Sequence, residues 1–209
     1  MILSLSAALA APTHAQLETA QWTTVSESKH WAVGQVTLSM AEVEGESCFR
    51  AVTQVGDVEL DRLFAVAKDP VSAVRWSSAK ITESEWLTRT DELLEYYQYL
   101  DVAIVSDRFW FVRATMEQAE GRRVVRWSPL PSDTDHKGFV TATRTRHASA
   151  VELSVNIGGW YLTAVDDGIQ VAYQVCSRSG TLARWIQDKA LKGALPSTVG
   201  DLVAEARRR

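Results

Sequence analysis

The chain has 209 residues, of which 46% are hydrophobic and 23% charged, which supports one sizeable core and excludes wholesale disorder or a fibrous class. The formal net charge of -4 argues against nucleic acid as a partner. Two cysteines without clustered histidines do not form a zinc site, and we expect no cofactor.

The N-terminal segment, residues 1–15, predicts a secretory signal peptide. Ile2 to Ala11 is a short apolar run, too short to span a bilayer core of about 30 Å, and Ala15 could precede a cleavage site. No basic residue precedes Ile2, so the alternatives are a start further upstream or a buried N-terminal extension. We expect an exported protein, periplasmic or secreted, with a cytoplasmic location as the alternative.

The next part of the chain predicts an arm, a strand and a helix. Residues 16–47 have a weak pattern, which we interpret as an N-terminal arm or short helix. Residues 48–55 form the first clear strand, because their apolar positions alternate. Asp57 fits the N-cap of a helix over residues 60–67, and residues 73–79 predict a short helix or loop.

The middle of the chain predicts a long antiparallel meander. Aromatic and β-branched residues, such as Tyr96, Tyr97 and Tyr99, favour strands over helices there. The expected strands cover residues 85–89, 95–101, 109–117, 122–127 and 139–146, with a loop at 129–138.

The last quarter predicts two strands and a long helix. Residues 151–164 alternate with a period of two, but the parity of the apolar positions flips at Gly158-Gly159, which indicates a bulge. Asp166-Asp167-Gly168 predicts a hairpin turn into a strand over residues 169–175. The apolar period then changes to about 3.6 residues over residues 182–206, as an amphipathic helix requires.

Cys48 and Cys176 lie out of phase with the apolar positions of their strands. Both sulfur atoms are therefore expected on the outer face of the sheet. If the two strands are neighbours, a cross-strand disulfide can form in an oxidising compartment. Two free thiols at a buried edge are the equal alternative.

This order of elements is an α+β layout. We expect a curved antiparallel sheet of about seven strands wrapped around one long C-terminal helix, with the apolar faces of both directed at a central space. Eight tryptophans are many for this length, and such large rings can either fill a core or line a ligand cavity.

Three segments resemble the START family of lipid-transfer domains, which have the helix-grip fold shared with Bet v 1-like proteins. They are Val105-Ser106-Asp107-Arg108, Gly159-Trp160-Tyr161-Leu162-Thr163-Ala164 and Ser179-Gly180-Thr181-Leu182-Ala183-Arg184-Trp185-Ile186. The chain departs from the family at Phe109, Ala164 and Ala183, where Asp, Pro and Pro are usual. The match covers roughly Cys48 to the C-terminus, and we expect one START-like domain over residues 16–209.

The resemblance implies a tunnel between the sheet and the terminal helix that binds, and in a carrier transfers, a lipid or similar hydrophobic small molecule. No catalysis is needed for that role, so we expect a binding protein and not an enzyme. The expected ligand-binding residues are Arg108, Trp110, Val112, Trp160, Leu162, Val171, Tyr173, Leu182, Trp185 and Ile186. Arg108 projects from an apolar row, so it either binds a lipid headgroup or internal acid, or reaches solvent at the strand end.

Two other functions stay open. A polyketide cyclase or aromatase on the related fold would need an acid and a base within the cavity, for which Arg108 and Tyr99 or Tyr173 are the candidates. A noncatalytic interaction module would have a packed interior. We expect a monomer, with transient membrane-surface contact through basic runs as the alternative to simple solvated surface.

Overall fold

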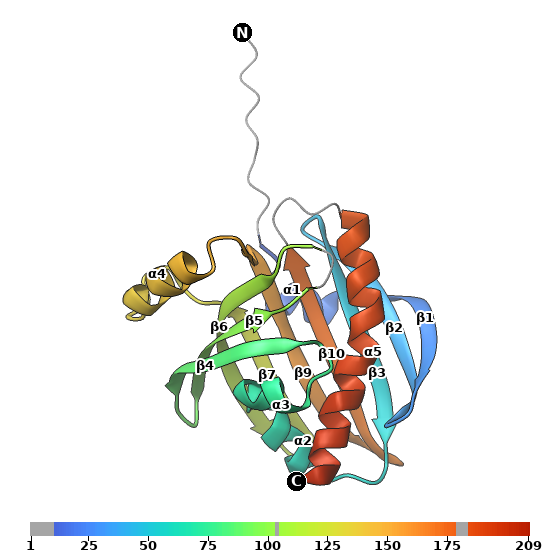
Figure 1. The fold of residues 1–209 in the computed structure, drawn as a ribbon. Coiled ribbons are helices and arrows are strands. Elements are labelled where there is room, and N and C mark those ends of the chain that lie inside the picture. The colour runs from blue at the N-terminus through green and yellow to red at the C-terminus, as the bar shows by residue number, and fades with distance from the viewer. Residues whose placement is uncertain (1–10, 103–104, 179–183) are drawn as a thin grey trace.

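The computed structural model describes residues 11–102, 105–178 and 184–209, and for residues 184–187 it describes the backbone alone. Within these ranges, ten strands form one sheet that curves around a long C-terminal helix (Figure 1). The strand order is β1-β2-β3-β10-β9-β7-β6-β5-β4, with every neighbouring pair antiparallel. Strand β8 pairs in parallel with β6. The described chain therefore has the α+β helix-grip architecture, with ten strands where we expected about seven.

The elements have the following bounds. The strands are β1 (Thr23–His30), β2 (Gly34–Val43), β3 (Glu46–Val55), β4 (Ile81–Arg89), β5 (Leu93–Leu100), β6 (Arg108–Ala119), β7 (Arg122–Pro129), β8 (Val151–Glu152), β9 (Val155–Val165) and β10 (Gly168–Arg178). The helices are α1 (His14–Thr19), α2 (Leu60–Ala67), η1 (Pro70–Ser72), α3 (Ala73–Trp76), α4 (Lys137–Arg146) and α5 (Arg184–Arg208).

The inner face of the sheet follows directly from the period-two pattern. Phe49, Ala51 and Val55 on β3, and Ile169 and Val171 on β10, are all buried in the main core. Helix α5 covers this face with a stripe of buried residues at helical spacing: Leu195, Val199, Leu202, Val203 and Ala206. The hydrophobic effect on these two faces holds the helix on the sheet.

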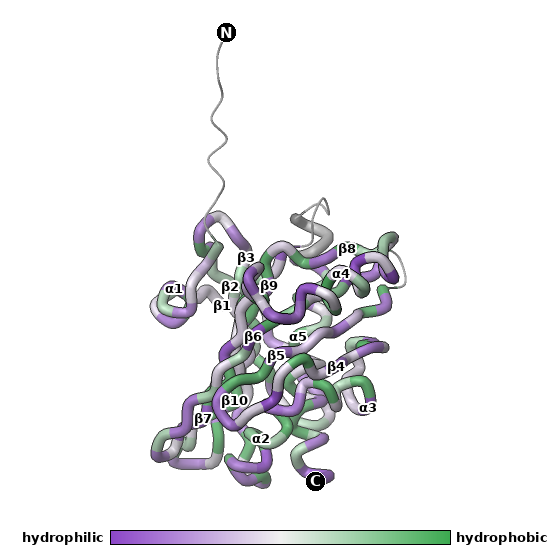
Figure 2. Tube along the Cα trace, turned by 90° about the vertical axis from the view of Figure 1, so that its left-hand side faces the viewer, coloured by the Kyte–Doolittle hydropathy of each residue, from purple (hydrophilic) through white to green (hydrophobic). Residues whose placement is uncertain are grey.

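The outer face carries a second buried cluster, which lies under α1. Leu17 is fully buried there against Val155 and Ile157, and Cys48 and Cys176 belong to the same cluster. Figure 2 shows α1 on one side of the sheet and α5 on the other. The central strands are therefore covered on both faces.

This double coverage corrects the bulge expected in β9. The strand runs through Gly158 and Gly159 with unbroken register to its neighbours. Val155 and Ile157 are buried on the outer face, whereas Trp160 is buried on the inner face. The apolar parity changes because the strand is buried on both faces, not because an extra residue is inserted.

Helix α1 begins with a capping box. The Thr13 hydroxyl accepts a bond from the Gln16 backbone N–H, and the Gln16 side chain accepts one from the Thr13 N–H. Residues 1–10 of the expected signal peptide lie outside the described residues. Cleavage after Ala15 would remove this cap, and the signal stays a prediction.

Residues 16–47, expected as an N-terminal arm or short helix, contain the end of the short helix α1, but most of the segment forms β1 and β2. Strand β1 is almost wholly exposed, so its sequence has no apolar alternation to identify it. It pairs with β2, whose inward residues Val36 and Leu38 are buried. These two strands account for most of the excess over the expected strand count.

The strand expected over residues 139–146 is also wrong, since α4 occupies it. Phe139 and Val140 pack on an outer-face aromatic cluster around Tyr97, which outweighs the strand preference of a Thr- and Val-containing segment. A histidine at each end of the helix makes a hydrogen bond to a carboxylate: His136 Nε2 lies 3.0 Å from Glu95, and His147 Nε2 lies 3.1 Å from Glu83.

Asp57 is not the N-cap of α2. The helix begins after Glu59, whose side chain makes no capping bond. Asp57 instead accepts a hydrogen bond of 2.6 Å from the Arg207 guanidinium, near the end of α5. Six other expected strands are confirmed. The ranges expected at 48–55, 85–89, 95–101, 109–117, 122–127 and 169–175 fall on β3, β4, β5, β6, β7 and β10, respectively.

Cys48 and Cys176 form a disulfide between the directly paired strands β3 and β10. Both residues are fully buried on the outer face, so the bridge is shielded from solvent reductants. It closes a loop with a sequence separation of 128 residues, a length at which cross-linking restricts the unfolded chain strongly.

Removal of this disulfide should lower the unfolding free energy. The double variant Cys48→Ala/Cys176→Ala should lose about 2–4 kcal/mol of unfolding free energy, because its unfolded state is no longer constrained. Urea unfolding measures this loss, and wild type unfolded under reducing conditions should match the variant. Equal midpoints for oxidised wild type and the variant would show that the bridge contributes nothing.

Candidate ligand cavity

A cavity of about 300 Å³ lies between α5, the inner face of the sheet and the α2–α3 segment. Its walls come from elements far apart in the chain. Helix α3 contributes Trp76 to the lining, β5 contributes Tyr96 and Gln98, and α5 contributes Leu191 and Leu195. Most of the lining side chains are apolar, so the interior favours an apolar occupant.

Three aromatic rings form the wall contributed by the sheet. The Tyr173 ring centroid lies 4.5 Å from that of Trp160 and 5.4 Å from that of Trp127. Gly158 leaves space for the Trp127 ring, since a Cβ atom there would come within 2.6 Å of it. The Trp127 indole donates a hydrogen bond of 3.1 Å to the Asn156 side chain. The rings are thus fixed in place by packing and by a satisfied polar contact.

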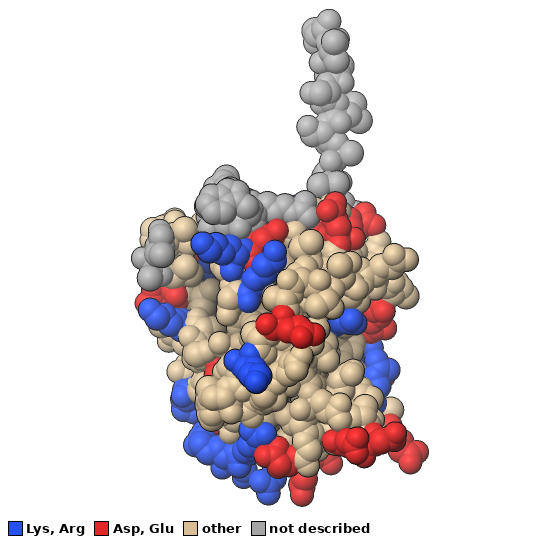
Figure 3. Space-filling view, turned by 90° about the vertical axis from the view of Figure 1, so that its right-hand side faces the viewer, with Lys and Arg blue, Asp and Glu red and all other residues tan. Residues whose placement is uncertain are grey.

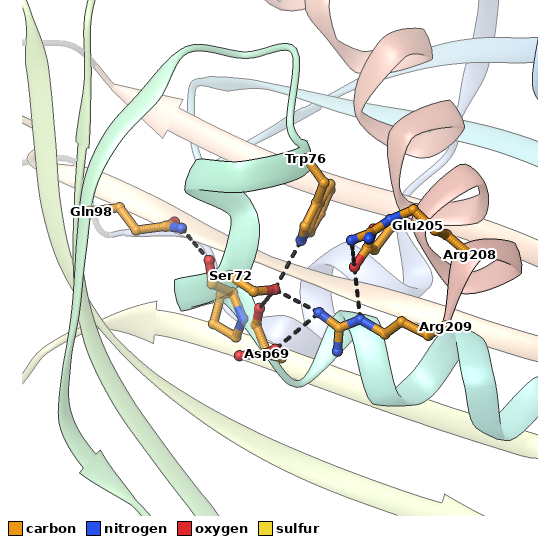
Figure 4. Close-up of polar contacts among 8 residues, drawn as sticks. Asp69, Ser72, Trp76, Gln98, Glu205, Arg208 and Arg209 are labelled. Carbon is orange, nitrogen blue, oxygen red and sulfur yellow. Dashed lines mark hydrogen bonds and ion pairs between the residues drawn. The ribbon is translucent and has the colours of Figure 1, made fainter.

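A polar network secures the wall formed by η1 and α3. Ser72 Oγ accepts bonds from the Trp76 indole at 2.9 Å and from the Arg209 guanidinium at 2.8 Å (Figure 4). Arg209 also pairs with Asp69 at 3.0 Å. Gln98 donates a bond of 2.9 Å to the Pro70 carbonyl. Ser72 therefore links the C-terminal end of the chain to Trp76, and Gln98 holds η1 from the side of the sheet.

Glu205 completes this network from within α5. It is 4% exposed and accepts bonds from Arg209 Nε at 2.8 Å and from Arg208 Nε at 2.8 Å. Burial raises the pKa of this carboxyl, but the hydrogen bonds from Arg209 and Arg208 lower the pKa by more than burial raises it. The pKa therefore lies below its ordinary value. The ionised form of Glu205 stabilises the fold.

The polar groups of the cavity are few. Arg108 lines it, is 7% exposed, and donates hydrogen bonds to the Ser106 and Asp107 carbonyls. Burial lowers the pKa of its guanidinium. Burial also raises the pKa of Tyr96 and of Tyr173, whose remaining accessible surface faces the cavity, so both phenols stay protonated at neutral pH. We expected Arg108 either to bind a polar group inside the cavity or to reach solvent at the strand end. Its burial contradicts the second alternative.

The structure separates the expected ligand-binding residues into three groups. Four line the cavity: Arg108, Trp110, Trp160 and Tyr173. Three are fully buried in the packed core and do not line it: Val112, Leu162 and Val171. Leu182 lies outside the described residues, as do the side chains of Trp185 and Ile186. Ligand contact by any of them stays a prediction.

Sequence reasoning missed the wall formed by residues 66–81 and by the middle of α5, from Ala190 to Leu202. Trp76 gave a signal, because a lone large ring in a short helical segment must bury its surface somewhere. Tyr96 and Gln98 share a strand parity, but only the path of the chain shows that this parity faces the cavity. Tyr99, a candidate acid or base, is not part of the lining; its hydroxyl donates to Asp107 at 2.6 Å.

Two further classes of site were sought in the described residues. No group of three or more His, Cys, Asp or Glu side chains there is placed to bind a metal ion. None of the helices in the same residues combines the length and the apolarity that a membrane crossing requires.

Comparison with solved structures identifies the fold. The chain is similar to a STAR-related lipid transfer protein from Xanthomonas axonopodis, with a TM-score of 0.70, 22% identity, and coverage of 89% of this chain and 98% of that one. It is similar to human STARD10, with a TM-score of 0.70, 14% identity, and coverage of 93% and 77%. It is also similar to the Zhui aromatase/cyclase from Streptomyces sp. R1128, with a TM-score of 0.58, 14% identity, and coverage of 78% and 94%.

No family model matches the sequence. No curated protein matches it either. The described chain nevertheless has a START-like domain fold, as its resemblance to the family implied. At these identities the likeness establishes the fold, and the chemistry of the cavity has to be argued from this chain.

The Glu205 network predicts a pH-dependent stability. The pKa of Glu205 is lower in the folded state than in the unfolded state. The carboxylate therefore adds to the unfolding free energy above the unfolded-state pKa of about 4.3, and this contribution is lost as the pH falls through the folded-state pKa. Glu205→Gln should cost about 1 kcal/mol at pH 7, and the difference from wild type should shrink below pH ~4. Urea unfolding at several pH values measures this.

The matched control is Glu120→Gln, at an exposed position outside the network. It should leave stability unchanged at each pH. A Glu205→Gln variant that is as stable as wild type at pH 7 would contradict the role given to this carboxylate.

Proposed function

We propose that this protein binds a lipid or similarly apolar small molecule in the cavity beneath α5. The observation that supports the proposal most strongly is the cavity itself, bounded by Trp76, Trp110, Trp127 and Trp160. Each CH₂ group moved from water into such a space gains about 0.8 kcal/mol. A short acyl chain therefore supplies several such increments without any catalytic group.

The size of the cavity bears on the ligand class. Ligand cavities typically hold roughly 300 to 1,000 Å³, and this one, at about 300 Å³, is at the lower end. It suits a single acyl chain or a compact ring system better than a two-chain phospholipid. Arg108 lines the cavity, and a guanidinium has five N–H donors, so it can bind the acidic or polar end of a ligand in addition to the Ser106 and Asp107 carbonyls.

Binding is favoured over the cyclase or aromatase alternative. Such a reaction needs an acid and a base in reach of each other. The described lining contains no Asp, Glu, His or Lys, and the raised pKa of Tyr96 and Tyr173 makes both poor bases. Turnover of an aromatic polyketide mimic by the purified protein would reverse this preference.

We also propose export and a monomeric carrier. The buried Cys48–Cys176 disulfide supports an oxidising compartment, periplasmic or extracellular.

Two surface features bear on transient membrane contact. Basic side chains gather at the lower left of Figure 3 beside acidic ones at the lower right, at the end where the C-terminus lies in Figure 1. Arg207 and Arg209 pair with Asp57 and Asp69, so these charges are partly compensated. Transient membrane contact is better supported by Trp31, which is 83% exposed in the β1–β2 turn.

The direct test of binding is native mass spectrometry of protein purified from its own host. We expect a bound apolar small molecule that organic extraction releases. Ala194→Trp places a ring at the cavity lining and should abolish this adduct. Lys189→Trp adds the same ring at an exposed position of the same helix that does not line the cavity, and should retain the adduct. Equal adducts in both variants would refute the cavity as the binding site.

Arg108 is tested by comparing an acid with its neutral ester. In isothermal titration calorimetry, Arg108→Met should weaken binding of decanoate about tenfold or more, because a charge-assisted hydrogen bond is lost. Methyl decanoate should bind wild type and variant with similar affinity, since its chain contacts are unchanged. An equal loss for both ligands would show that Arg108 acts through packing alone.

A further inference from the structure

A second hollow lies on the outer face of the sheet, on the side opposite the cavity. It has a volume of about 640 Å³ and is open to solvent beside α1, which Figure 2 shows on this side of the sheet. Its floor includes Arg50, Ala172 and Gln174, and one wall includes Glu18, Trp22 and Tyr161. Most other lining residues are polar, in contrast to the apolar cavity beneath α5.

The register of the sheet places these groups around one point. Gln174 on β10 lies directly opposite Arg50 on β3 and opposite Gly159 on β9. Gly159 has no side chain, so the Tyr161 ring can lie against it; a Cβ atom there would come within 2.8 Å of the ring. The Arg50, Gln174 and Tyr161 side chains are therefore held on paired backbone and not on loops.

Several polar atoms in this hollow are buried without a hydrogen bond. They are Trp22 Nε1, Arg50 Nε, Tyr161 Oη and Gln174 Oε1, which are four of the seven such side-chain atoms in the described chain. Gln174 is 6% exposed and Tyr161 is 8% exposed, yet both line the hollow. Buried polar groups are nearly always paired in folded proteins, so in this hollow either water or a ligand completes their hydrogen bonds.

Arg50 gives the hollow an uncompensated positive charge. Its guanidinium lies 4.9 Å from the centroid of the Trp22 ring, and no carboxylate of the described residues pairs with it. Burial lowers the pKa of Arg50, and no neighbouring charge opposes that shift. Glu18, the carboxylate in the wall, is paired with Arg126 at 2.7 Å. Water molecules could satisfy the hydrogen bonds of these groups, but they cannot supply a counter-charge.

We propose that the outer hollow binds a small organic acid through its carboxylate. The planar guanidinium of Arg50 matches a carboxylate with two parallel donors, one of them the unpaired Nε. The Trp22 indole and the Tyr161 hydroxyl supply further donors, and the Gln174 amide binds a neighbouring polar group of the ligand. This site is separate from the lipid cavity in position and in chemistry.

The test follows the indole N–H of Trp22 by ¹⁵N-edited NMR, with Trp22→Phe used to assign the signal. Succinate is the probe, succinamide is its neutral counterpart, and inorganic phosphate is the competing anion. We expect a saturable shift with succinate, little with succinamide, and weaker binding of phosphate than of succinate. Arg50→Met should weaken succinate binding at least about tenfold, and Arg50→Lys should lie between, because it keeps the charge but loses the fork.

Two controls separate this site from the rest of the molecule. Lys29→Met removes an exposed cation of β1 outside the hollow and should leave succinate affinity unchanged. Ala194→Trp, which blocks the lipid cavity, should also bind succinate normally, so the two proposals fail independently. If Arg50→Met does not fold, Gln174→Leu and Arg50→Lys replace it, and both should bind succinate more weakly than wild type.

Three results would overturn the proposal. The first is no saturable shift of the Trp22 signal with succinate. The second is equal affinity in wild type and in folded Arg50→Met. The third is tighter binding of phosphate than of succinate, which would exclude the carboxylate class.

Discussion

The cavity depends on how α5 is held against the sheet. Its C-terminal half carries the buried stripe that includes Leu195, Val199 and Leu202, and Arg209 ties that end to η1. Leu191, Leu195 and Leu202 contact the core and also line the cavity, so α5 packs on the sheet with part of its inner surface and faces the space with the rest. A helix packed with its whole inner surface would close the space, so partial packing is the constraint from which the cavity follows.

Burial on both faces of the central strands explains why the molecule has two unlike hollows. The inner face has rigid aromatic rings, three of them tryptophans, whose shapes leave an apolar space when the sheet curves. The outer face is apolar under α1, where Leu17 and its neighbours cover it, and under α4, where the Tyr97 cluster lies. Beside α1 the same strands carry Arg50 and Gln174, and the surface becomes polar.

Much of the fold could be predicted from the sequence, and the failures have physical causes. Alternation identified β3 and β10, and it placed Cys48 and Cys176 on the outer face, because inner-face burial imposes a period of two. Strand β1 was missed because it is an exposed edge strand. Helix α4 was missed because its contacts with the Tyr97 cluster and with Glu83 and Glu95 are all distant in sequence. For the same reason the lining from residues 66–81 could not be predicted, since it depends on where the chain crosses the sheet.

Xenon binding tests the central claim, that the interior is hollow and apolar, most directly. Xenon enters dry apolar cavities because it gains dispersion contacts there without losing hydrogen bonds. A crystal structure determined under xenon pressure should show a xenon site among Trp76, Trp160 and Leu191. Electron density in which these side chains meet, with no xenon between them, would contradict a ligand cavity and leave only the fold.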